Sequence, residues 1–269
     1  MVMDRYRVKP GEKVRLDRID PDETSAWEGD KSEAKARVEA LNARLEELQE
    51  LLYAEGKHKV LIVLQAMDAA GKDSTIRRIF DRTNPQGVKV QSFKVPSEEE
   101  RAHDYLWRVH ARTPGAGEMM IFNRSHYEDV LVVRVKGFAP RERWEKRYGH
   151  IRDFERLLVD EGTTVLKFFL HISKDEQKQR FEDRLKDPTK HWKFRKADLD
   201  DRALWDDYMR AYEDALAETS SEAAPWYVIP ANHKWYRDWL ITKILVSRLE
   251  ALSMAYPPAE PGLEDIVVV

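Results

Sequence analysis

One stretch, VLIVLQAMDAAGKDSTIRRIF at residues 60–80, constrains the fold more than any other part of the sequence. Five apolar residues lead into a short polar turn that ends in Gly71 and Lys72, and a segment of helical character follows. A buried strand, a tight turn and a helix in this order form the phosphate-binding loop of α/β proteins. The consensus G-x-x-x-x-G-K-[ST] is broken twice, because Ala66 replaces the first glycine and Asp73 replaces the Ser or Thr. We therefore predict a loop that binds phosphate groups, either those of a nucleotide or those of another phosphate chain.

The rest of the chain alternates between short apolar segments and helical patterns. Strands are predicted at 59–65, 88–93, 118–122, 164–171 and 226–230. Helices are predicted at 72–83, 98–111, 126–135, 141–161, 174–186, 201–219 and 233–252. Short strands separated by helices form a parallel sheet that is covered on both faces. The expected fold class is α/β, a P-loop kinase-like three-layer sandwich with a central parallel sheet and a helical lid.

This pattern predicts a single domain, residues 1–269, with additions at both ends. Residues 1–57 comprise an extended arm and then a helix, for which Ser32 is the expected N-cap and Gly56 the end. Apolar side chains recur in this helix at spacings of three and four, and we expect them to pack on the core or on a partner: Val38, Leu41, Leu45, Leu48 and Leu52. Residues 174–200 form the expected lid segment, and residues 257–269 form a tail.

Composition excludes several classes of protein. Hydrophobic residues make up 42% of the chain, yet no run approaches the roughly 18 to 20 apolar residues that span a bilayer. The first residues lack the apolar core of a signal peptide, and the absence of cysteine excludes disulfides and thiolate metal sites. A net charge of −3 argues against a general nucleic-acid binder. We expect a soluble cytoplasmic protein with neither a nucleic-acid nor a membrane partner.

The loop itself suggests a cation. Backbone N–H groups in a tight turn before a helix attract anions, and Ala69, Ala70 and Gly71 are small enough for phosphate to approach closely. Lys72 adds a mobile positive charge. Asp68 is unexpected, because a carboxylate repels phosphate unless Mg²⁺ lies between them. The sequence therefore predicts Mg²⁺ beside Asp68.

A second polar cluster follows the predicted strand at 118–122. Asn123, Arg124 and Glu128 come at its carboxyl end, where ligands bind in parallel α/β sheets. Arg124 can span phosphate oxygens, and Glu128 can reach a metal or a sugar hydroxyl. The same residues are also compatible with a capped turn, in which Ser125 is the N-cap and Glu128 closes a capping box.

A third cluster is basic. Residues 174–196 hold nine Lys or Arg against five Asp or Glu, and Arg180 and Arg184 share one face of a helix. Lys190 and Lys193 follow Pro188 with no acidic run nearby, which favours contact with phosphate in a mobile lid. The alternative for residues 174–186 is a solvated helix with i,i+4 ion pairs. The interleaved Trp192 and Phe194 are expected to pack.

Taken together, these residues resemble the polyphosphate kinase 2 family. The resemblance rests on MDAAGKDST, NRSHYEDVL, DPTKHWKF and TSSEAAPWYVIPANHKW, and it extends from about Tyr6 to Tyr256. Asn123 is typical of the branch that accepts both AMP and ADP. The resemblance implies reversible, Mg²⁺-dependent transfer of a phosphoryl group from inorganic polyphosphate to AMP and ADP, which yields ATP. It also implies a homo-oligomer, either a dimer or a tetramer.

The resemblance also implies roles for individual residues. Those implied to be catalytic are Asp68, Lys72, Asn123, Arg124 and Glu128. Those implied to bind phosphate or nucleotide are Ala69, Ala70, Gly71, Lys72, Asp73, Ser74, Arg124, Arg180, Arg184, Lys190 and Lys193. Asp68 and Glu128 are the candidate metal ligands, although the match leaves open whether Glu128 binds metal or nucleotide.

Two other functions fit parts of the sequence. One is an ATP-dependent nucleoside monophosphate kinase resembling thymidylate kinase, against which Ala66 and Asp73 argue. The other is a non-catalytic nucleotide-binding module whose leucine-rich helix meets a partner. The many Lys and Arg residues argue against that module, because cations are costly to hold together unless they meet anions.

Overall fold

The computed structural model describes residues 2–268, apart from the side chains of residues 2 and 264. Its sheet has five strands in the order β2-β3-β1-β4-β5, and every pairing is parallel. The strands are β1 (Lys59–Gln65), β2 (Val88–Gln91), β3 (Met119–Asn123), β4 (Thr163–His171) and β5 (Trp226–Pro230). All five coincide with predicted strands to within a few residues. The sequence signal is strong because a parallel strand that is buried on both faces is a nearly continuous apolar run.

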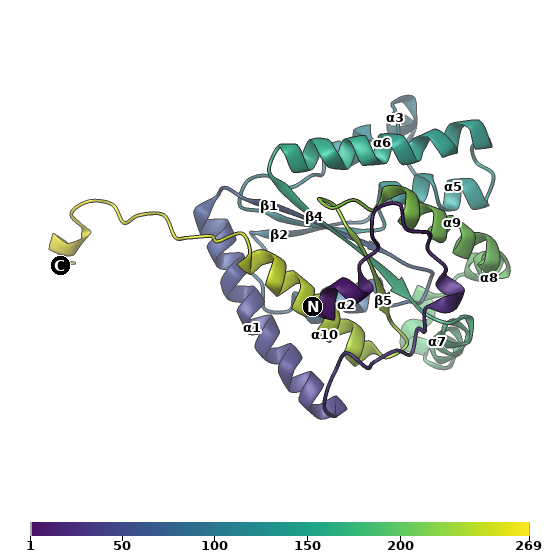
Figure 1. Cartoon of the computed structure of the whole chain (residues 1–269), viewed down its shortest axis with the longest axis horizontal. Helices are drawn as coiled ribbons and strands as arrows, with labels where there is room; N and C mark the ends of the chain where they lie inside the picture. Colours follow the sequence, from purple (N-terminus) through teal and green to yellow (C-terminus); the bar gives the residue numbers. More distant parts are fainter. Residues whose placement is uncertain (1, 269) are drawn as a thin grey trace.

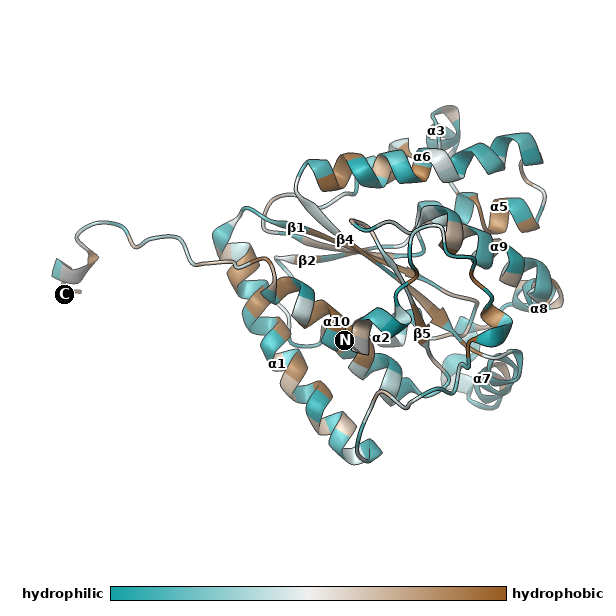
Figure 2. Ribbon diagram, in the orientation of Figure 1, coloured by the Kyte–Doolittle hydropathy of each residue, from teal (hydrophilic) through white to brown (hydrophobic). Residues whose placement is uncertain are grey.

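Helices cover both faces of the sheet (Figure 1). One layer contains α1 (Lys31–Glu55), α2 (Lys72–Ile79) and α10 (Lys234–Glu250). The opposite layer contains α5 (Val132–Val135), α6 (Arg141–Asp160) and α9 (Trp205–Thr219). Figure 2 shows hydrophobic residues concentrated on the strands and on the inner sides of the helices. The predicted three-layer sandwich is confirmed.

Three predicted helices are interrupted. The segment 98–111 divides into α3 (Glu98–Ala102) and α4 (Trp107–His110), because the Asp104 side chain accepts from the N–H groups of Leu106 and Trp107 and forms a local turn. The segment 126–135 contains a 3₁₀ turn, η3 (His126–Asp129), before α5. The predicted helix 201–219 begins earlier, as α8 (Ala197–Ala203), and breaks at Leu204 before α9.

The long helix α1 packs along α10. Its five predicted apolar residues are all buried, so this face is covered within the chain. The predicted N-cap at Ser32 is wrong. Asp30 caps the helix, because its side chain accepts from the N–H groups of Ser32 and Glu33 while Glu33 bonds back to the Asp30 N–H. Gly56 ends the helix in the left-handed conformation at φ 64°.

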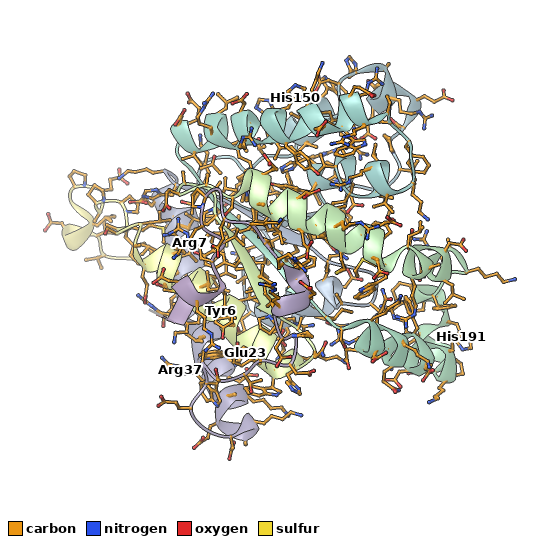
Figure 3. The ribbon with its side chains drawn as sticks, turned by 45° about the vertical axis from the view of Figure 1, so that its right-hand side comes forward. Tyr6, Arg7, Glu23, Arg37, His150 and His191 are labelled. Atoms are coloured by element: carbon orange, nitrogen blue, oxygen red, sulfur yellow. The ribbon has the colours of Figure 1, made fainter. Side chains whose placement is uncertain are left out.

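The N-terminal arm is anchored to the core. It contains two 3₁₀ turns, η1 (Val2–Tyr6) and η2 (Leu16–Arg18), and it buries Tyr6, Val8 and Leu16. The Val8 N–H donates to the Trp226 carbonyl of β5 at 2.9 Å. The Tyr6 hydroxyl donates to Glu23 at 2.5 Å within the arm, in the region labelled in Figure 3. The tail beyond Pro257 extends away from the sheet and carries the short turn η5 (Leu263–Asp265) (Figure 1).

The topology brings the loop after β1 and the polar cluster after β3 to one edge of the sheet. The turn after β1 and the turn after β3 leave the same edge of the sheet, because β1 and β3 are parallel neighbours. The helix α7 (Lys174–Lys186), the turn η4 (Pro188–Lys193) and α8 lie beyond this edge (Figure 1). Among residues 2–268 no helix is long and apolar enough to cross a membrane.

Candidate active site

The phosphate loop runs from the end of β1 at Gln65 to the start of α2 at Lys72. Its backbone is bent sharply, with φ values of 63° at Ala69 and 107° at Gly71. Two buried side chains of α7 hold its carbonyl groups. Gln177 donates to the Asp68 carbonyl at 3.0 Å, and Arg180 donates to the carbonyls of Ala69 and Ala70 at 3.1 and 2.7 Å. These bonds turn the carbonyl oxygens, which would repel phosphate, toward α7.

Arg237 of α10 supports the loop from a second direction. It is 1% exposed, and Asp238 binds it through two hydrogen bonds of 2.8 and 2.7 Å. Its Nη1 donates to the Ala70 carbonyl at 3.4 Å and would lie 2.4 Å from a Cβ placed on Gly71. Both the close approach of Arg237 and the positive φ therefore require glycine at position 71. Sequence reasoning missed Arg237, although an Arg-Asp pair inside an apolar helix was a usable signal.

Lys72 lies at the start of α2, half-buried over the loop. Its Nζ donates to the Ala66 carbonyl at 2.8 Å, at the position where the consensus has glycine. Burial and the nearby Arg124 lower the pKa of Lys72 to about 8, although Asp68 and Glu128 act in the opposite direction. The ammonium is thus destabilised in the free protein, and a phosphate chain would stabilise it.

Two direct contacts join the turn after β3 to the loop. Arg124, which has φ 67°, donates to the Asp68 carboxylate at 2.8 Å. Asn123 donates to the Asp73 carboxylate at 2.6 Å. The acidic residue that replaces the usual Ser or Thr therefore has an amide partner in the second motif. The Ser74 hydroxyl instead donates to the Gly71 carbonyl at 2.8 Å.

Glu128 lies on the same side of the turn as Arg124. Burial raises the pKa of Glu128, while Arg124, Lys72 and Gln65 oppose that rise. Burial lowers the pKa of Arg124, but Glu128 and Asp68 outweigh it, so the net direction is upward. Ser125 caps the turn as predicted, but Glu128 closes no capping box because its carboxyl group faces these partners.

The donor set around Arg124 is compatible with Mg²⁺. Asp68 and Glu128 both interact with the Arg124 guanidinium, so this position already attracts a cation. Mg²⁺ typically takes one or two carboxylates and completes its shell with phosphate oxygens and water. No cluster of three or more His, Cys, Asp or Glu ligands occurs within residues 2–268.

The lid residues divide into two groups. Arg180 is 8% exposed and also donates to Glu176, to the Ala231 carbonyl at 2.7 Å and to the Asn232 carbonyl at 3.1 Å. Its guanidinium therefore binds carbonyl groups of the loop and of residues 231 and 232. Its pair with Glu176 is one of the predicted i,i+4 ion pairs of α7. In this conformation Arg180 therefore supports the loop.

The other lid cations are not brought to the loop in this structure. Arg184 donates to the Lys193 carbonyl at 3.1 Å, and Lys190 pairs with a single acidic residue, Asp187, at 2.7 Å. Phe194 packs on Phe181 as predicted. Trp192 is 77% exposed, so the prediction that it packs is wrong. Its neighbour in the chain, His191, lies at the outer edge of the lid (Figure 3).

A basic cavity lies next to the side chains that support the loop. It has a volume of about 600 Å³. Its wall includes Glu176 and Asp238, the partners of Arg180 and Arg237. The cations that line it are Lys31, Lys35, Arg78 and Lys234, with His233 beside them. Burial and the neighbouring Arg180 and Arg237 lower the pKa of Lys234, which shows how closely positive charge is gathered here. Sequence reasoning missed this cavity, because four separate elements build it.

The strand order and the loop, with Lys72 and Arg124 converging over it, define a P-loop kinase-like protein. Residues 28–257 match the family model described as Polyphosphate kinase 2. The chain therefore belongs to the polyphosphate kinase 2 family, as the sequence motifs indicated.

Individual relatives cover nearly the whole chain. An AMP/ADP-polyphosphate phosphotransferase of Meiothermus ruber is 64% identical over 99% of this chain and 100% of its own length. An ADP-polyphosphate phosphotransferase of Rhodopseudomonas palustris is 44% identical over 96% of this chain and 93% of its own. The crystal structure of polyphosphate kinase 2 from Arthrobacter aurescens TC1 superposes with a TM-score of 0.94 at 45% identity, and covers 98% of this chain and 94% of that one.

Proposed function

We propose that this protein is a polyphosphate-dependent nucleotide kinase that transfers the terminal phosphoryl group of inorganic polyphosphate to AMP and ADP. The observation that carries the proposal is the meeting of Lys72, Arg124, Asp68 and Glu128 at the shared edge of β1 and β3. Phosphoryl transfer depends mainly on positioning and charge neutralisation, which these groups can supply. The activities of the two relatives supply the substrates.

The cavity beside the loop favours a phosphate chain as donor over ATP. A nucleobase is typically held in a largely apolar slot with a few polar groups. This cavity instead presents Lys31, Lys35, Arg78 and Lys234, which suit a polyanion. The arrangement therefore disfavours an ATP-dependent monophosphate kinase. The burial of the leucine-rich face of α1 against α10 removes the surface that the non-catalytic module required.

The chemistry needs no general base. The attacking atom is a phosphate oxygen of AMP or ADP, which is already ionised at neutral pH. A new P–O bond forms to that oxygen as the bond to the bridging oxygen of the chain breaks, and the chain leaves one phosphate shorter. Lys72 would neutralise the transferred group, and Arg124 would exchange Asp68 for phosphate oxygens. Because both partners are phosphates, the reaction is reversible.

Mg²⁺, when bound, would neutralise phosphate oxygens as a Lewis acid, and Asp68 and Glu128 would hold it. Arg184, Lys190 and Lys193 would approach the phosphates when the lid closes and excludes water. As the resemblance implies, we also expect the chain to form a homo-oligomer, which analytical ultracentrifugation would test.

A donor comparison tests this function. Purified protein is incubated with Mg²⁺ and AMP, with polyphosphate in one reaction and ATP in the other. ADP and ATP formed only with polyphosphate support the proposal. Product formed only with ATP would support the monophosphate kinase, and no product in either reaction would support a binding module.

A further inference from the structure

A buried polar network lies behind the turn that carries Arg124 and Glu128. Its centre is Glu155 of α6, whose carboxylate is reached by the Tyr127 hydroxyl at 2.7 Å and by His126 Nε2 at 3.3 Å. Lys167 of β4 donates to the same carboxylate at 2.5 Å, to the Tyr127 hydroxyl at 3.0 Å and to the Thr219 carbonyl at 2.8 Å. All these side chains are at most 2% exposed.

Such a network is not explained by stability alone. A buried ion pair loses the hydration of both charges, and well-packed apolar side chains of similar size are often as stable or more stable. Burial raises the pKa of Glu155, but Lys167 and His126 outweigh it and keep the carboxyl group ionised. Most buried side chains of this core are apolar, so the charged pair of Glu155 and Lys167 calls for a specific role.

The position of the network suggests that role. Residues 124–128 form one turn with two sides. Arg124 and Glu128 face Asp68 and Lys72, whereas His126 and Tyr127 point into the core. The hydroxyl of Tyr127 also lies 2.9 Å from Thr219 Oγ1, which Trp226 of β5 contacts at the same distance. Side chains from α6, α9, β4 and β5 thus belong to one network on the inner side of this turn.

We propose that Glu155, whose charge Lys167 balances, is a positioning residue that holds His126 and Tyr127 so that Arg124 and Glu128 meet the phosphates in the productive geometry. Arg124 needs such support, because a non-glycine residue at φ 67° is unfavourable in a flexible turn. A displacement of about 1 Å in a catalytic group can cost roughly a hundredfold in rate. The inference rests on the proposed phosphoryl transfer.

Two double variants separate positioning from simple stability. Glu155→Leu/Lys167→Met removes both charges and leaves residue 155 unable to accept a hydrogen bond. Glu155→Gln/Lys167→Met removes the same charges but keeps an acceptor for Tyr127. We expect the Leu variant to lose about tenfold or more in kcat and the Gln variant to stay within about threefold of wild type, with KM for AMP changed less than about threefold in both.

The measurements are kcat, KM for AMP and the unfolding midpoint of each full-length protein. Wild-type kcat in a folded Leu variant would overturn the proposal, as would equal losses in both variants. If the Leu variant does not fold, Tyr127→Phe decides, with Tyr148→Phe on α6 as the matched control that removes another buried hydroxyl. Tyr127→Phe should then lower kcat several-fold more than its control at a similar unfolding midpoint, and equal kcat would overturn the proposal. Failure of the proposed function would show instead in the wild-type protein, as absence of polyphosphate-dependent product.

Discussion

The phosphate loop and the lid are both rich in charge, yet they are held very differently. Buried side chains from α7 and α10 fix the loop through its carbonyl groups. In the lid, Lys190 pairs locally with Asp187, and Lys193 lies over the exposed ring of Trp192. The loop is preorganised during folding, whereas the lid keeps its side chains available for a ligand. We therefore expect loop substitutions to affect turnover and lid substitutions to affect binding.

The largest effect is expected for Lys72→Met, which keeps the side-chain stem and removes the charge. If Lys72 neutralises the transferring phosphate, kcat should fall about a hundredfold or more. The unfolding midpoint at pH 7 should not fall, because burial holds the pKa of Lys72 at about 8, below its usual 10.5. Charging this lysine therefore costs the folded wild-type protein stability below pH 8.

The pH dependence gives a second check on Lys72. Wild-type stability should rise relative to Lys72→Met as pH increases from about 8 toward 10.5, because the unfolded lysine is still protonated there and the folded one is not. Thermal unfolding of both proteins across this range measures the difference. A folded variant with near wild-type turnover would contradict the role of Lys72.

Asp68→Asn should lose roughly a hundredfold in turnover and need more Mg²⁺ for half-maximal rate, because one proposed ligand of the cation is lost. Without Mg²⁺ it should bind phosphate at least as well as wild type, since Arg124 is released from its carboxylate partner. A Mg²⁺ titration beside melting curves tests this. Unchanged Mg²⁺ dependence with a stability loss of about 1 kcal/mol would instead indicate a turn-capping role.

Arg180→Lys should show a smaller loss of turnover, about tenfold, together with reduced stability. Lysine cannot reproduce the fork with which Arg180 binds four carbonyl groups and Glu176. We expect a loss of about 2 kcal/mol in the free energy of unfolding. Arg184→Lys, one turn along the same helix, is the matched control and should change stability by less than about 0.5 kcal/mol. Equal effects at both positions would remove the distinction between them.

The smallest effect on turnover is expected for Lys190→Ala/Lys193→Ala. This variant should raise KM for polyphosphate several-fold and leave kcat and stability nearly unchanged. It should also weaken the salt dependence of KM, because fewer phosphate contacts remain to be screened. The control is Lys178→Ala, which removes an exposed cation that pairs with Glu182 on α7. Kinetics identical to this control at low and high salt would exclude the lid lysines from the site.

The strands and the strand-end motifs could be predicted because their signals are local. An apolar run before Gly71 and a polar cluster after Asn123 each determine their own structure, and a parallel sheet brings them to one edge. Asp30 could also have been found, because Asp30 and Glu33 have the spacing of a capping box. Ser32 is also a residue type that caps helices, but it lies two positions after the N-cap that the structure shows.

The supports of the site could not be predicted in the same way. Arg180 was assigned to phosphate from its charge, but its partners are backbone carbonyls about 50 to 110 residues away. Gln177, Arg237 and the Glu155–Lys167 pair likewise depend on how α6, α7 and α10 pack, which periodicity does not determine. A buried charge in an apolar segment signals that a partner exists without identifying it.

The most direct measurement follows the phosphorus atoms of the donor. ³¹P NMR of wild-type protein with Mg²⁺, AMP and polyphosphate should show loss of chain phosphate as the β-phosphate of ADP and then the γ-phosphate of ATP appear. Lys72→Met, recorded under the same conditions, should show neither within the time that wild type needs for completion. Nucleotide products that appear at the same rate in both proteins, or only when ATP replaces polyphosphate, would contradict the assignment of this loop to a phosphate chain.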